Sequence, residues 1–133
     1  MKYGLKYEVI EKMQAVFWRY SEIEKVILYG SRAKGTYKKG SDIDLTIKGD
    51  RIDLTLLFKI ENELDDLFLP YKIDLSIYNS IQNPDLLDHI ERVGKEFFIR
   101  KNLKKNEMAD QQTNKPASVK ELFKKTQEEQ QQQ

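Results

Sequence analysis

The stretch from Val26 to Lys48 constrains the fold of this chain most, because it links two strand patterns through a Gly-Ser pair. The apolar run Val26-Ile27-Leu28-Tyr29 ends at Gly30-Ser31, ten residues intervene, and Asp42-Ile43-Asp44 opens a stretch of alternating polar and apolar residues. The apolar run predicts a buried strand, and the alternation predicts a strand with one buried face. We therefore expect a small sheet with the Gly-Ser pair at a strand end.

Helical patterns surround these strands. Apolar residues recur every three or four positions over residues 5–20 and 52–69, and Asn83-Pro84 is typical of the start of a helix that ends at Gly94. Residues 72–78 alternate like a strand, and residues 97–99 form a short apolar run. The order of these elements predicts an α/β fold with helices packed on a small sheet. It does not say which strands are antiparallel.

Composition limits the classes of function. The chain has 133 residues, which suits one domain, and its formal net charge of +1 provides no long-range field for holding nucleic acid. There are no cysteines to form disulfides or thiolate metal sites. No stretch is long and apolar enough for a membrane span, and the N-terminus lacks the apolar core of a signal peptide. We expect a cytoplasmic protein that binds neither membrane nor nucleic acid directly.

The composition changes near residue 101. Residues 1–100 are expected to form the folded domain, and the nearly all-polar residues 101–133 a disordered C-terminal tail. Ser118-Val119-Lys120-Glu121 fits a capping box, which predicts a short helix near 118–127 as the alternative. Such a helix could dock on a partner.

The Gly-Ser pair and the aspartates suit two parts of one ligand. Backbone N–H groups at a strand-to-helix turn favour a phosphate, and Ser31 adds a hydroxyl donor beside Gly30. Asp42 and Asp44 share a strand face, where two carboxylates repel each other unless a cation such as Mg²⁺ lies between them. Asp74 belongs to the alternating pattern of residues 72–78, and it supplies a third carboxylate if the two strands are neighbours. It would then bind metal or accept the proton of an attacking hydroxyl.

Each piece has an ordinary explanation when taken alone. Gly30-Ser31 could simply cap a helix, and Asp42 could be a solvated residue at a strand start. These explanations do not account for the whole set in its strand-turn-strand context, which favours nucleotidyl transfer with pyrophosphate as the leaving group. His89, the single histidine, is interpreted as a surface or interface residue of its helix.

These motifs resemble those of the DNA polymerase β-like nucleotidyltransferase superfamily, whose signature is Gly-Ser, ten residues, Asp-x-Asp and a later Asp. The run GSRAKGTYKKGSDIDL is especially similar to the minimal nucleotidyltransferases, called MNT or MntA-like. The resemblance covers residues 5 to about 100 and implies a small mixed sheet with helices packed on one side. It further implies that Gly30, Ser31 and Arg32 hold the nucleotide, and that Asp42, Asp44 and Asp74 are catalytic and bind Mg²⁺.

The resemblance also implies a role. Minimal nucleotidyltransferases are commonly antitoxins that transfer AMP from ATP to a tyrosine hydroxyl of a HEPN-domain toxin. A domain of about 100 residues leaves no room for a separate acceptor domain, so the acceptor surface is expected from a partner or a second copy in an oligomer. Two alternatives remain open: neutralisation of the partner by binding alone, and nucleotidyl transfer to a small molecule such as an aminoglycoside.

Overall fold

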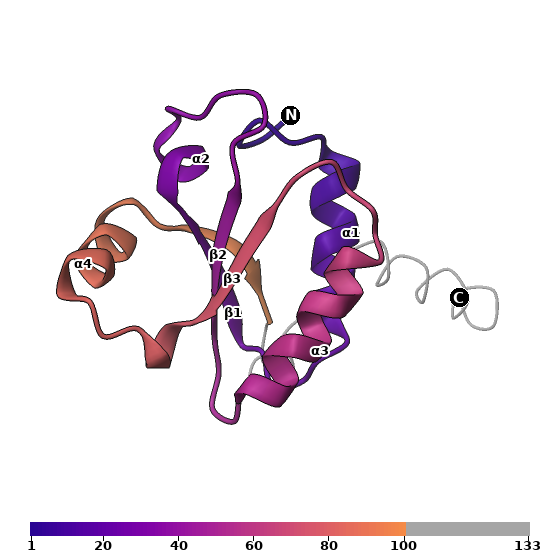
Figure 1. The fold of residues 1–133 in the computed structure, drawn as a ribbon, viewed down its shortest axis with the longest axis vertical. Coiled ribbons are helices and arrows are strands. Elements are labelled where there is room, and N and C mark those ends of the chain that lie inside the picture. Colours follow the sequence, from indigo (N-terminus) through magenta and orange to yellow (C-terminus); the bar gives the residue numbers. More distant parts are fainter. Residues whose placement is uncertain (101–133) are drawn as a thin grey trace, which may run out of the picture. The chain divides into compact units, whose positions relative to one another are not determined.

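A four-stranded sheet lies at the centre of the computed structural model, which describes residues 1–100 (Figure 1). Its strands are β1 (Lys25–Tyr29), β2 (Ile43–Lys48), β3 (Ile73–Ile77) and β4 (Lys95–Ile99), in the order β3-β2-β1-β4. β1 pairs antiparallel with β2 and β4, whereas β2 and β3 are parallel. The predicted α/β fold with a small mixed sheet is confirmed. The predicted tail and its helix near 118–127 lie outside the described residues.

Two long helices cover one face of the sheet. They are α1 (Tyr7–Trp18) and α3 (Leu54–Asp65), which lie on the same side of the strands in Figure 1. The apolar stripe predicted for the first helix is buried throughout: Leu5, Val9, Met13, Val16, Phe17 and Tyr20. Every second residue of β2 is also buried on this side, at Ile43, Leu45 and Ile47. The core therefore lies between these helices and one face of the sheet.

The remaining helical elements lie around the other face. They are α2 (Gly30–Lys34), the 3-10 helix η1 (Tyr78–Ser80) and α4 (Pro84–Val93). The side chain of Asn83 accepts the N–H groups of Asp85 and Leu86, which confirms the predicted helix start. α4 packs against β1 and α2, away from α1 and α3 (Figure 1). At its end, a Cβ added to Gly94 would lie 2.7 Å from Ile27 Cγ2, so helix and strand are in close contact.

The predicted end of α3 is wrong. The apolar pattern predicted a helix to residue 69 that includes Phe68, but α3 ends at Asp65 and the Phe68 side chain is 87% exposed. The N–H groups of Leu67 and Phe68 bond to carbonyls three residues earlier, and Phe68 takes a φ of 53°. Pro70 disfavours a helical Leu69 as well, so the chain leaves the helix one turn before the proline. None of the helices within residues 1–100 combines the length and apolar character needed to cross a membrane.

Candidate active site

The turn between β1 and α2 places Gly30 directly against Asp44. Gly30 has a φ of 76°, which favours glycine, and a Cβ added to it would lie 2.3 Å from Asp44 Oδ2. Glycine is therefore required both by the backbone and by the space that the carboxylate occupies. Ser31 follows in the first turn of α2, where backbone N–H groups have no partner within the helix. The predicted phosphate donors thus lie beside a predicted metal ligand.

The sheet register brings Asp44 and Asp74 together. They are direct partners in the parallel pairing of β2 and β3, and Tyr29 is the partner of Asp44 on β1. Paired residues point to the same side of a sheet, so these three side chains lie on the face opposite Ile43 and Leu45. We call this the polar face; it carries Tyr29, Asp44, Thr46, Asp74 and Ser76. Asp42 lies just before β2 and is exposed.

A hydrogen-bonded pair of hydroxyls forms the floor of the polar face. Thr46 is fully buried although it lies on the side that the alternating pattern assigned to polar residues. Ser76 Oγ donates to Thr46 Oγ1 at 2.9 Å. This bond joins β2 to β3 two residues along each strand from the paired aspartates. Burial of Thr46 is tolerated because its hydroxyl has this partner.

The carboxylates repel one another. Burial raises the pKa of the Asp44 carboxyl, the negative charges of Asp74 and Asp42 raise it further, and His89 lowers it. Burial likewise raises the pKa of the Tyr29 hydroxyl, the nearby Ser76 hydroxyl lowers it, and the charges of Asp74 and Asp44 raise it. The polar face therefore concentrates negative charge, and no ion pair within residues 1–100 involves these carboxylates.

Oxygen ligands with excess negative charge fit Mg²⁺, which is commonly held by one or two carboxylates together with substrate phosphates. The in-register carboxylates of Asp44 and Asp74 beside the Gly30-Ser31 turn meet this description. Within residues 1–100, however, no three acidic or histidine side chains are gathered closely enough to form a ready metal site. The arrangement suits a metal whose coordination a bound nucleotide completes.

Arg32 has a different environment from the one predicted. Its side chain is 2% exposed, and its guanidinium donates to the Ser41 carbonyl at 2.9 and 3.1 Å and to the Tyr3 carbonyl at 2.9 Å. The rings of Tyr37 and Tyr71 lie 5.2 and 5.1 Å from its Cζ atom. Because these contacts engage the guanidinium, they favour a scaffold role, in which Arg32 ties the loop before β2 to the N-terminal segment, over direct contact with a triphosphate.

His89 lies at the site, although sequence reasoning placed it on a surface or interface. Its Nε2 accepts the backbone N–H of Gly30 at 3.0 Å, and its ring lies edge-on to Tyr29 with 6.1 Å between centroids. Asn83-Pro84 and Gly94 located α4 in the sequence but not the element that α4 packs against. The available signal was that His89 directly precedes Ile90, an apolar residue that the fold buries.

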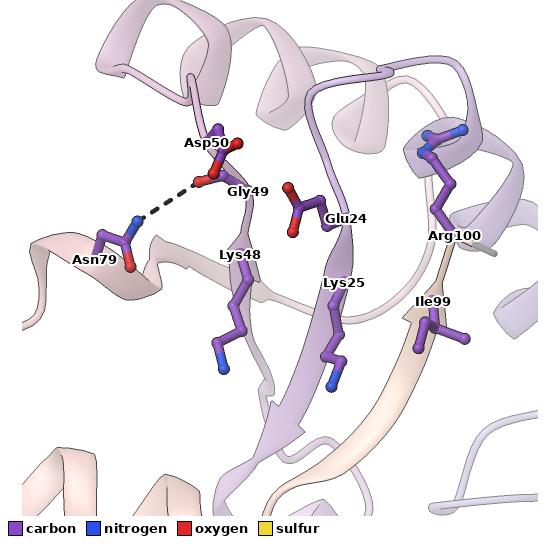
Figure 2. Close-up of a pocket in the computed structure, with 8 residues that line it drawn as sticks. All are labelled: Glu24, Lys25, Lys48, Gly49, Asp50, Asn79, Ile99 and Arg100. Atoms are coloured by element: carbon purple, nitrogen blue, oxygen red, sulfur yellow. Dashed lines mark hydrogen bonds between the residues drawn. The ribbon is translucent and has the colours of Figure 1, made fainter. Parts of the chain in front are cut away.

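A cavity in the described part of the chain lies away from the aspartates. It has a volume of about 420 Å³, and Lys25 and Lys48 are among the residues that line it (Figure 2). These lysines are direct partners at the start of β1 and the end of β2, whereas Tyr29 and Asp44 pair at the opposite ends of those strands. The cavity and the carboxylates therefore lie at opposite ends of these two strands.

Comparison with known proteins agrees with this geometry. The profile of the family described as "Polymerase beta, Nucleotidyltransferase" matches residues 11–103. Two proteins of Methanocaldococcus jannaschii, MJ1217 and MJ0126, are 35% and 34% identical to the chain over 85 residues. Each match covers 63% of this chain and 86% of the relative, and both relatives are provisionally named protein adenylyltransferases.

Solved structures share the fold. A chain in the crystal structure of a toxin–antitoxin with AMP-PNP has a TM-score of 0.55 at 19% identity, covering 96% of this chain and 94% of that chain. A chain in the complex of tri-AMPylated Shewanella oneidensis HEPN toxin with MNT antitoxin has a TM-score of 0.54 at 15% identity, covering 96% and 93%. The resemblance to minimal nucleotidyltransferases is thus confirmed for the fold, and the chain belongs to the polymerase beta nucleotidyltransferase family.

Proposed function

We propose that the chain transfers AMP from ATP to a hydroxyl group of a partner protein, with Mg²⁺ held by Asp42, Asp44 and Asp74. The observation that carries this proposal is the pairing of Asp44 with Asp74 beside the Gly30-Ser31 turn. Phosphate donors and metal ligands are thereby adjacent, as transfer from a nucleoside triphosphate requires. The names of the two relatives favour a protein acceptor.

Different residues of the site bind the phosphates, hold the metal and accept the proton. The hydroxyl and N–H of Ser31 bind phosphate oxygens, while bound Mg²⁺ would neutralise charge on the triphosphate and the carboxylates. The acceptor oxygen attacks the α-phosphorus, the bond from this phosphorus to the bridging oxygen breaks, and pyrophosphate leaves. Asp74 is exposed and adjacent to Asp44, so it can hold the metal together with Asp44 or accept the proton of the attacking hydroxyl.

The proposed partner is a HEPN toxin, and the proposed target is one of its tyrosines, which makes the chain an antitoxin. The toxin–antitoxin complexes that share the fold support this choice. Residues 1–100 form one compact unit that contains all three carboxylates, and the acceptor in this proposal comes from another molecule. The cytoplasmic location, the oligomeric state and the lack of direct nucleic-acid binding stay predictions.

The test uses ATP labelled at either the α- or the γ-phosphate, incubated with Mg²⁺, the purified chain and a purified HEPN-domain toxin. We expect label in the partner from α-labelled ATP alone, because AMP carries only the α-phosphate. Asp44→Asn should abolish the labelling, and the matched change Asp50→Asn, in the exposed loop after β2, should leave it intact.

Three results would oppose the proposal. Label from the γ-phosphate would indicate phosphoryl transfer instead. Full neutralisation of the toxin by Asp44→Asn would show that binding alone suffices. Modification of a small molecule such as an aminoglycoside, with the protein partner unlabelled, would redirect the acceptor assignment.

A further inference from the structure

His89 makes a contact that links α4 to the proposed nucleotide site. Its Nε2 accepts the N–H of Gly30 at 3.0 Å, and its ring packs edge-on against Tyr29, the residue before the turn. Because Nε2 accepts this bond, the ring proton belongs on Nδ1. The His89 side chain, from a distant part of the sequence, therefore contacts both the last residue of β1 and the first residue of α2.

The backbone N–H group of Gly30 needs an acceptor from outside α2. It belongs to the first residue of α2, so it has no acceptor within the helix. The same residue has a positive φ, and its Cα hydrogens face the Asp44 carboxylate without space for a methyl group. Any rotation of the peptide before Gly30 would move the turn relative to Asp44, and the hydrogen bond to His89 opposes this rotation.

We infer that His89 is a positioning residue, which fixes the Gly30-Ser31 turn in the orientation that binds the triphosphate of ATP. By accepting the Gly30 N–H, His89 leaves the hydroxyl and N–H of Ser31 as the donors that face the nucleotide. The inference rests on the proposed function only in that the turn binds a nucleotide, and it holds whatever the acceptor is. His89 itself contacts no reacting atom.

The test measures ATP affinity by calorimetry in the full 133-residue chain without any acceptor. His89→Phe keeps a ring against Tyr29 but has no acceptor for the Gly30 N–H, and we expect it to weaken ATP binding about tenfold. His89→Gln offers a side-chain oxygen near the position of Nε2, and we expect it to restore most of the affinity. Ile90→Val, in the next and buried residue of α4, serves as the control for lost packing and should bind ATP normally.

Amide hydrogen exchange of Gly30 provides the readout that packing alone would not change. Exchange should accelerate in His89→Phe and stay slow in His89→Gln and Ile90→Val. Unchanged or tighter ATP binding by His89→Phe, or equal losses in the Phe and Gln variants, would overturn the positioning role. If the unchanged chain failed to bind ATP, the proposed function itself would fail; binding without transfer would count only against the acceptor.

Discussion

Replacement of Asp44 by Asn should stabilise the fold while it removes activity. The pKa of the Asp44 carboxyl is raised by burial and then by the charges of Asp74 and Asp42, so the folded state disfavours the ionised form. Asn keeps the shape of the side chain and removes its charge. The repulsion across the strands is removed with it, and no packed group is lost.

The magnitude follows from the register. Partners on neighbouring strands lie about 4.8 Å apart, so the charges of Asp44 and Asp74 are separated by about 5 Å. Because Asp74 is exposed, an effective dielectric constant between about 40 and 80 is appropriate, and the repulsion is then about 1–2 kcal/mol. We expect the free energy of unfolding to rise by about 1 kcal/mol, which corresponds to about 4–8 °C in Tm for a domain of this size.

The pH dependence provides an internal check. Since the pKa of Asp44 is higher in the folded than in the unfolded state, the folded state binds more protons between the two values. The unfavourable contribution of Asp44 is therefore absent below its ordinary pKa, grows as pH rises toward the raised value, and is complete above it. The advantage of Asp44→Asn should be present at about pH 7 and diminish toward about pH 4.

The assay is urea unfolding of both proteins at the two pH values without nucleotide or metal, with Asp50→Asn as the control for loss of an exposed charge. The control should stay within about 0.5 kcal/mol of the unchanged chain. If Asp44→Asn is less stable than the unchanged chain at neutral pH, or if its advantage is the same at both pH values, the carboxylates do not repel each other as the register indicates.

Two further changes test parts of the fold that the sequence did not reveal. Arg32→Lys cannot reach both the Ser41 and Tyr3 carbonyls, so we expect urea unfolding to show a loss of about 2–4 kcal/mol; a loss below about 0.5 kcal/mol would contradict the scaffold role. Phe68→Asn should instead gain about 0.5–1 kcal/mol in the same assay, because Asn tolerates the positive φ and the exposed ring contributes little packing; a loss of stability would show that the ring is needed.

The features that sequence patterns could predict are local. The faces of β2 follow from alternation, and the start of α4 follows from Asn83-Pro84, since neither depends on distant partners. The end of α3 was misjudged because Phe68 continues the apolar spacing after the helix has closed. The spacing of apolar residues shows which of them could share one face of a helix. The length of the helix depends on which of those residues pack against the sheet.

The site shows the same division between local and distant information. Gly30, Ser31, Asp42 and Asp44 lie within fifteen residues, so their chemistry could be predicted from one segment. The place of Asp74 depended on whether β3 would pair with β2 and in which register, and a one-residue shift would have turned its side chain away from Asp44. The alternation within each strand could not decide this, because it shows neither which strands pair nor in which register they do so.

The contact between His89 and Gly30 explains why the fold requires α4 on the polar side of the sheet. An N–H without a helical acceptor and two in-register carboxylates would each weaken an isolated sheet. α4 supplies the missing acceptor from one side, and the tightly packed core under α1 and α3 supports the strands from the other. The unfavourable features are thereby confined to the one strand end at which a charged nucleotide and its metal would offset them.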